Sequence, residues 1–132
     1  MIRGIGVDMT EIEEIRRFLA AETISGPYVR QTFTKAEQEA AAGLKDPAEY
    51  LAARFAAKEA VFKALAPLLP EKTFDLRMVE TLNREDGSPC VNTDGPLSGI
   101  LRRADVDTLH ISITTEGLYA AAFVIAEREA SH

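Results

Sequence analysis

Three side chains of this 132-residue chain could together hold a divalent cation and a phosphate group: Asp8, Glu59 and Lys63. Carboxylate oxygens are hard ligands, and Mg²⁺ often takes one or two carboxylates together with phosphate oxygens and water. A nearby lysine neutralises the same phosphates as a point charge. The three residues form such a site only if the strand that carries Asp8 lies beside the helix that carries the other two.

Asp8 ends a predicted strand that begins at Ile2. Alternation along the strand puts Gly4, Gly6 and Asp8 on the same face. Glycine has no side chain, so we expect room beside the carboxylate for a metal ion or a phosphate. The alternative is that Asp8 caps the helix that follows, which is a common role for aspartate.

A long helix is predicted from about Ala48 to Leu65, because this segment is rich in alanine and Pro47 is tolerated in a first turn. Glu59 and Lys63 are four residues apart on one face of this helix. The alternative to a functional role is an ordinary helix-stabilising Glu–Lys pair, worth a few tenths of a kcal/mol.

Lys58 falls within the apolar stripe of the same helix, which is formed by Leu51, Phe55, Phe62 and Leu65. An unpaired buried ammonium is costly, so Lys58 needs an anionic partner or a route to solvent. The alternative is that its long side chain reaches the surface while only its stem is buried.

Two further helices are predicted from capping boxes, in which a threonine is followed three residues later by a glutamate. Thr10 with Glu13 predicts one helix start, and Thr34 with Glu37 predicts another whose helix ends at Gly43.

The second half of the chain is richer in strands. We expect strands over residues 74–82, 90–93, 109–114 and 118–127, a helix from Pro96 to about Ala104, and a turn at Glu116–Gly117 that makes the last two strands an antiparallel hairpin. Helices that come early and strands that come late predict an α+β fold, and the length predicts one domain over residues 1–132.

Composition narrows the functional class. The net charge of −6 argues against a general nucleic-acid binder. The first residues do not read as a signal peptide, and the longest apolar stretch, Leu118 to Ala126, is about half of what a membrane-spanning helix needs. Cys90 is the single cysteine, which excludes an intramolecular disulfide. These features predict a cytoplasmic protein.

Five segments carry a family resemblance, and they occur in the family's order and spacing. They are IGVDMTEIEEI from Ile5, FTKAEQE from Phe33, RFAAKEAVFKAL from Arg54, DGSP from Asp86 and HISITTEGLYAAAFVIAE from His110. Over nearly its full length the chain resembles the holo-acyl-carrier-protein synthases, which belong to the 4′-phosphopantetheinyl transferases.

The resemblance implies a mainly antiparallel sheet packed against a long helix. It also implies a magnesium-dependent transferase that moves 4′-phosphopantetheine from coenzyme A to a serine of an apo acyl carrier protein and releases 3′,5′-ADP. Such enzymes serve fatty-acid or polyketide synthesis. Members of this short type commonly form homotrimers with sites between subunits.

Catalytic roles are implied for the residues of the first strand and the long helix. Asp8 and Glu59 match the carboxylates that hold magnesium, and Lys63 matches a lysine near the coenzyme phosphates. Arg54 and Lys58 occupy helix positions that line or support the coenzyme site.

Binding roles are implied elsewhere. Gly87 and Pro89 match a loop near the adenine, and Ser112 matches a serine that approaches the nucleotide end. Arg16 and Arg17 match basic residues that face the acidic carrier protein. Without the resemblance, the two arginines read equally well as a solvated helix end that the helix dipole favours.

Two departures from the family pattern concern the coenzyme. Residues Ala66 to Pro70 stand where a glycine-rich GTG turn is usual, and Thr115 stands where a histidine is usual. Glycine permits close approach of the backbone to phosphate, and histidine can carry a positive charge that threonine cannot. The departures keep open a second interpretation, a non-catalytic relative that binds coenzyme A or a carrier protein. A plain α+β structural domain is a third.

Overall fold

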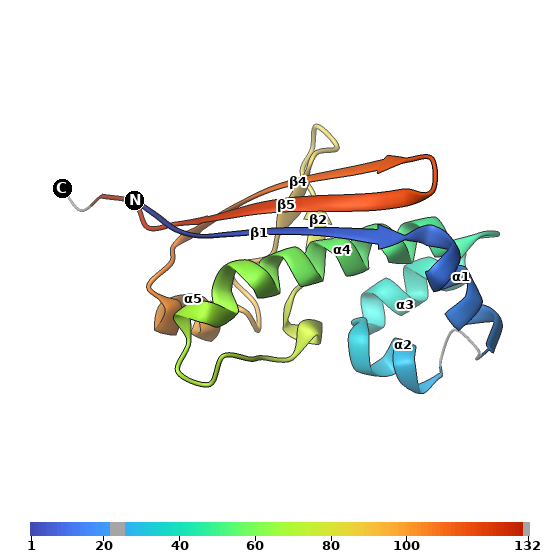
Figure 1. Ribbon diagram of the computed structural model, residues 1–132, viewed down its shortest axis with the longest axis horizontal. Coiled ribbons are helices and arrows are strands. Elements are labelled where there is room, and N and C mark those ends of the chain that lie inside the picture. The colour runs from blue at the N-terminus through green and yellow to red at the C-terminus, as the bar shows by residue number, and fades with distance from the viewer. Residues whose placement is uncertain (22–25, 131–132) are drawn as a thin grey trace.

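The computed structural model describes residues 1–21 and 26–130. Its main layer is a three-stranded antiparallel sheet of order β1-β5-β4 (Figure 1). The strands are β1 (Ile2–Glu11), β4 (Thr108–Glu116) and β5 (Tyr119–Glu127). Gly117 turns the chain between β4 and β5 at a φ of +59°, a conformation that glycine adopts without strain. The predicted C-terminal hairpin is therefore confirmed.

A long helix, α4 (Pro47–Leu65), runs along one face of the sheet (Figure 1). The Asp46 side chain caps its start by accepting a hydrogen bond from the Ala48 amide, and a 3-10 turn, η1 (Ala66–Leu68), follows its end. The boundaries predicted for this helix and the α+β class are both confirmed. No helix of the described residues, α4 included, is both long and apolar enough to cross a lipid bilayer.

Small residues bring α4 unusually close to β1. A Cβ atom built on Gly6 would lie 1.9 Å from the carbonyl oxygen of Ala60, and one on Gly4 would lie 2.2 Å from that of Ala64. The helix backbone fills the space beside both glycines. The expectation that the glycines leave room for a metal ion or a phosphate is therefore wrong, because they make room for α4.

Three shorter helices gather at one end of α4: α1 (Ile12–Ala21), α2 (Pro27–Thr32) and α3 (Lys35–Ala42) (Figure 1). The capping box of Thr34 and Glu37 and the end of α3 at Gly43 are confirmed. The capping box predicted at Thr10 is wrong. Strand β1 continues through this residue to Glu11, which pairs with Tyr119, and the helix starts only at Ile12.

The segment predicted as a strand over residues 74–82 is mostly not a strand. It contains a 3-10 turn, η2 (Leu76–Met78), which the Asp75 side chain caps, and only β2 (Thr81–Asn83) is extended. β2 pairs with β3 (Pro89–Val91) in a small antiparallel hairpin, and α5 (Ser98–Ala104) leads into β4. Figure 1 shows this hairpin beside β4, at the opposite edge of the sheet from β1.

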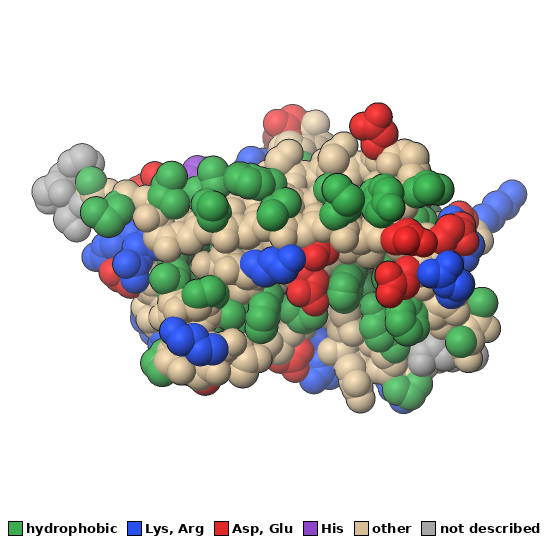
Figure 2. Space-filling view, in the orientation of Figure 1, with side chains coloured by type: hydrophobic (Ala, Val, Ile, Leu, Met, Phe, Trp, Pro, Cys, Tyr) green, Lys and Arg blue, Asp and Glu red, His purple; other side chains and the backbone are tan. Residues whose placement is uncertain are grey.

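The sheet face that α4 does not cover is apolar and open. Figure 2 shows hydrophobic side chains in a row over the strands. On β1 the exposed fractions are 62% for Ile5, 57% for Val7 and 66% for Met9, and on β5 Phe123 is 45% exposed. Solvated apolar surface on this scale is typical of an interaction site.

Candidate active site

The close packing of β1 on α4 brings Asp8, Glu59 and Lys63 together. The Lys63 ammonium lies 3.3 Å from Asp8 Oδ1 and donates a 3.0 Å hydrogen bond to the Val7 carbonyl. Asp8 and Glu59 line the same cleft, which has a volume of about 370 Å³. The strand that carries Asp8 therefore lies beside the helix that carries Glu59 and Lys63, as a shared site requires. Lys63 contacts Asp8 across the interface between the two elements, rather than serving only as the helix partner of Glu59.

The electrostatics of the cleft favour a bound cation. Partial burial raises the pKa of Glu59, the negative charge of Asp8 raises it further, and Lys63 opposes both effects. Two carboxylates that repel each other in one cleft are stabilised when a cation binds between them.

The oxygen donors of the cleft are of the kind that magnesium takes. Among the described residues, no group of three or more His, Cys, Asp or Glu side chains could form a cage around a metal ion. Asp8 and Glu59 offer a carboxylate pair in the cleft, which leaves coordination positions for phosphate and water. Mg²⁺ is usually bound in this way, whereas Ca²⁺ takes a larger set of protein oxygens.

Aromatic side chains form the other wall of the cleft. Phe18 stacks on Tyr28 with ring centroids 4.8 Å apart, and Tyr28 lies 6.4 Å from Phe55. From the sequence, Phe18 and Phe55 are simply apolar positions on two helices. Their common cleft arises only when α1, α2 and α4 pack together.

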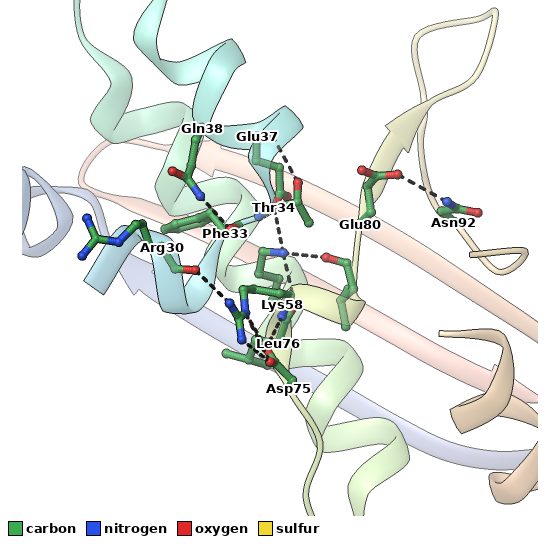
Figure 3. Close-up of polar contacts among 12 residues, drawn as sticks. Arg30, Phe33, Thr34, Glu37, Gln38, Lys58, Asp75, Leu76, Glu80 and Asn92 are labelled. Carbon is green, nitrogen blue, oxygen red and sulfur yellow. Dashed lines mark hydrogen bonds and ion pairs between the residues drawn. The ribbon is translucent and has the colours of Figure 1, made fainter. Parts of the chain in front are cut away.

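Lys58 does not line the cleft, so of the two roles that the resemblance implies for it, lining or supporting the coenzyme site, its burial fits the supporting one. Its side chain is completely buried and lies 2.8 Å from Glu37 Oε1. It also donates hydrogen bonds to the carbonyls of Leu76 and Val79, at 3.2 and 2.5 Å. Figure 3 shows Lys58 between Glu37 of α3 and the η2 segment. The required anionic partner is therefore Glu37, and the alternative that Lys58 reaches the surface is wrong.

Arg54 is half-buried on α4, one turn before Lys58. Its guanidinium lies 4.8 Å from the ring centroid of Tyr50, a cation–π contact, and its Nε atom is buried without a hydrogen-bond partner. Tyr50 and Thr115 line a separate hollow of about 400 Å³ near the start of α4. Thr115, the residue that replaces the expected histidine, is thus on the surface of this hollow.

The two arginines implied to bind the carrier are already paired within the chain. Arg16 forms ion pairs with Glu13 and with Asp46, the latter at 2.8 Å. Arg17 lies 3.7 Å from Glu11, and its side chain is 69% exposed. Arg17 is the more available of the two.

Ser112, Gly87 and Pro89 lie away from Asp8. Ser112 is in register with Phe123, which is in register with Val7, so its side chain lies on the exposed face of the sheet. Asp8 follows Val7 and points to the opposite face. Gly87 is at the tip of the β2–β3 hairpin with a φ of +87°, and Pro89 begins β3. Within one chain these residues do not share a site with the carboxylate pair.

Sheet, helix and cleft together define an α+β protein with a candidate site for a divalent cation and a phosphate. The family model described as the 4′-phosphopantetheinyl transferase superfamily matches residues 4–124. The chain belongs to this family, which confirms the resemblance found in its sequence.

Individual relatives agree with this assignment. The holo-[acyl-carrier-protein] synthase of Anaeromyxobacter dehalogenans is 37% identical over 128 residues, which are 96% of this chain and 97% of the relative. A crystal structure of the Neisseria meningitidis holo-[acyl-carrier-protein] synthase matches with a TM-score of 0.82 at 27% identity, covering 97% of this chain and all of that one. A Bacillus anthracis synthase structure in complex with coenzyme A (3′,5′-ADP) matches with a TM-score of 0.75 at 29% identity, covering 98% and 99% of the two chains.

Proposed function

We propose that this protein is a holo-acyl-carrier-protein synthase. It transfers 4′-phosphopantetheine from coenzyme A to a serine of an apo acyl carrier protein. The observation that carries the proposal is that Asp8 and Glu59 line one cleft and that Lys63 contacts Asp8. These are the positions that the family resemblance assigns to the metal and the coenzyme phosphates.

The reaction is a phosphoryl transfer. The carrier serine oxygen forms a bond to the β-phosphorus of coenzyme A, the bond to the bridging oxygen breaks, and 3′,5′-ADP leaves. Asp8 and Glu59 would hold magnesium, which when bound neutralises phosphate charge. Lys63, which contacts Asp8 from α4, stabilises negative charge on the same phosphates. Glu59, or a water molecule in the cleft, is our candidate to accept the serine proton.

A second hollow extends the site beyond Lys63. It has a volume of about 390 Å³ and is lined by the apolar residues Phe62, Ala66 and Pro67 and by two lysines, Lys63 and Lys72. Apolar walls beside two ammonium groups suit a nucleotide. The residues that replace the glycine-rich turn therefore form part of a surface that a coenzyme can occupy.

The exposed sheet face supports assembly of the homotrimer that the family implies. Ser112 lies on this face, away from Asp8 of its own chain. A second copy packed against the apolar strands would bury Val7 and Phe123 and could bring its Ser112 toward a coenzyme bound near Asp8. If the coenzyme binds between subunits, Asp8 of one chain and Ser112 of another can belong to the same coenzyme site.

The charge pattern bears on the carrier. The protein has a net charge of −6, and acidic side chains flank the cleft at Glu11 and Glu14. An acidic carrier would approach by forming new ion pairs, for which the exposed Arg17 is better placed than Arg16. We place the activity in cytoplasmic fatty-acid synthesis, with a polyketide carrier as the other substrate class.

Retention of the whole carboxylate–lysine set favours catalysis over the non-catalytic alternative. The test is to incubate the protein with an apo acyl carrier protein, coenzyme A and Mg²⁺ and to measure the carrier's intact mass. We expect a gain of one phosphopantetheine, which is lost with Glu59→Ala or with a chelator. Coenzyme A binding without any mass gain, across several carriers, would support the non-catalytic alternative.

A further inference from the structure

Both oxygens of the Asp8 carboxylate are held by groups of this chain. The Thr10 hydroxyl lies 2.8 Å from Oδ2, and the Lys63 ammonium lies 3.3 Å from Oδ1. The Asp8 side chain keeps 16% of its surface exposed, and it lines the cleft that it shares with Glu59. Its orientation toward this cleft is therefore restrained from two sides.

The length of β1 makes the threonine contact possible. Because the strand continues through Glu11, Asp8 and Thr10 are two residues apart on the same face. Thr10 is only 8% exposed. An ionised carboxylate can only accept hydrogen bonds, so the hydroxyl donates, and a bond of this kind to a charged group is stronger than one between neutral groups.

The two contacts differ in how firmly they hold the carboxylate. Lys63 has a long flexible side chain that is 51% exposed, and a lysine of this kind can turn toward substrate phosphates. Thr10 is short, buried and β-branched, so it has few alternative rotamers. When phosphates draw Lys63 away, Thr10 is the contact that remains.

We propose that Thr10 is a positioning residue of the candidate magnesium site. Its hydroxyl holds the Asp8 carboxylate in the orientation in which Asp8 and Glu59 serve one ion. This inference rests on the proposed function. Groups that hydrogen-bond a metal ligand orient it, and their loss typically costs about 10–100-fold in metal affinity or activity. A purely structural Thr10 would instead only satisfy its own buried hydroxyl.

Thr10→Val removes the hydroxyl at nearly constant volume, and Thr10→Ser keeps it. We would titrate Mg²⁺ into each protein saturated with coenzyme A and follow the heat of binding. We expect Thr10→Val to weaken Mg²⁺ affinity about 10–100-fold and Thr10→Ser to stay near the wild-type value. In the transfer assay, Thr10→Val should raise the Mg²⁺ concentration needed for half-maximal rate more than it lowers kcat.

The matched control is Thr81→Val on β2. Thr81 is likewise a buried strand threonine, 5% exposed, but its hydroxyl has no hydrogen-bond partner and it is not part of the cleft. Thr81→Val should bind Mg²⁺ as the wild type does. Wild-type Mg²⁺ affinity in folded Thr10→Val would overturn the inference while leaving the proposed function intact.

The remaining outcomes also decide the question. If Thr10→Val does not fold, as judged by circular dichroism, the comparison moves to Thr10→Ala and Thr10→Ser. If Mg²⁺ binding is weaker in Thr10→Ala but not in Thr10→Ser, the inference is supported. If the two variants bind Mg²⁺ with equal affinity, the inference is overturned. If the wild-type protein binds neither coenzyme A nor Mg²⁺, the proposed function fails and this inference fails with it.

Discussion

Lys58 and Glu59 are neighbours in sequence, yet their side chains lie in opposite environments. Successive residues of a helix point about 100° apart, so Lys58 enters the interior while Glu59 reaches the cleft. Burial lowers the pKa of Lys58, and the Glu37 carboxylate opposes this effect. The same helix turn thus carries a structural ion pair and a candidate metal ligand.

The buried pair predicts a large loss of stability when one partner is removed. Lys58→Met leaves the Glu37 carboxylate, which is 3% exposed, without its cation. This should lower the free energy of unfolding, measured by urea titration, by about 3–5 kcal/mol. Adding Glu37→Gln removes the stranded charge and should recover part of this loss. Lys35→Met, at an exposed lysine of α3, should change it by no more than about 0.5 kcal/mol. If Lys58→Met and Lys35→Met had the same free energy of unfolding, the buried pair would not be important for stability.

The raised pKa of Glu59 predicts a pH-dependent penalty in the metal-free protein. The folded state holds this proton more tightly than the unfolded chain does, so stability falls as pH rises from the usual glutamate range through the raised pKa. Glu59→Gln should therefore raise the free energy of unfolding at pH 7, by less than about 1 kcal/mol because the cleft is open to solvent.

Urea unfolding at a series of pH values checks this prediction. The gain from Glu59→Gln should vanish below the usual glutamate pKa, and Glu39→Gln, at an exposed position of α3, should show no such trend. If the stabilisation by Glu59→Gln instead grew as the pH fell, it would contradict a raised pKa of Glu59.

At the scale of elements, the contact between β1 and α4 builds the site. The glycines of β1 allow its backbone to touch that of the helix, and this sets the distance between Asp8 and the residues of α4. The hydrogen bonds from Lys58 to Leu76 and Val79 fix the η2 segment against the other side of the same helix. Helix α4 is therefore held from both sides.

Gly6→Ala should destabilise the fold. The added methyl would overlap the Ala60 carbonyl at 1.9 Å, so one backbone must move, at a cost of about 1–3 kcal/mol or more. The matched control is Gly43→Ala, where the nearest atom is 3.7 Å away and φ is −83°. That change should stabilise by about 0.4–1 kcal/mol, since alanine restricts the unfolded chain. Thermal unfolding measures both, and an unaffected Gly6→Ala would show that the close approach is not required.

At the scale of the whole molecule, the sheet separates two unlike faces. One is covered by α4, and the other exposes Ile5, Val7 and Met9 to solvent. Burial of apolar surface is the main driving force for protein association. The uncovered face therefore argues for self-association of the chain.

Val7→Glu should disrupt this association. The carboxylate would replace an apolar side chain that is 57% exposed in the middle of β1, and its desolvation at an interface is costly. Light scattering after size-exclusion chromatography should give a trimer for the wild type and a monomer for the variant. Leu44→Glu, at an exposed leucine outside the sheet, should remain a trimer. A wild-type monomer would refute assembly through this face.

The sequence by itself was sufficient to predict structural features that depend on residues close together in the chain. The Thr34–Glu37 capping box and the alanine-rich helix that ends at Leu65 depend on residues within a few positions of each other. The motifs around Asp8 and Glu59 were sufficient for the family.

The tertiary structure decided what depends on distant segments. The pairing of β1 with β5 extended the strand through Thr10, which side-chain chemistry alone predicted to be a helix cap. The choice of Glu37 as the partner of Lys58, 21 positions away, followed from the packing of α3 on α4. Periodicity reports which face of an element is apolar, but not which element covers that face. Only the packed chain therefore showed that the glycines of β1 accommodate a helix and that one sheet face stays open.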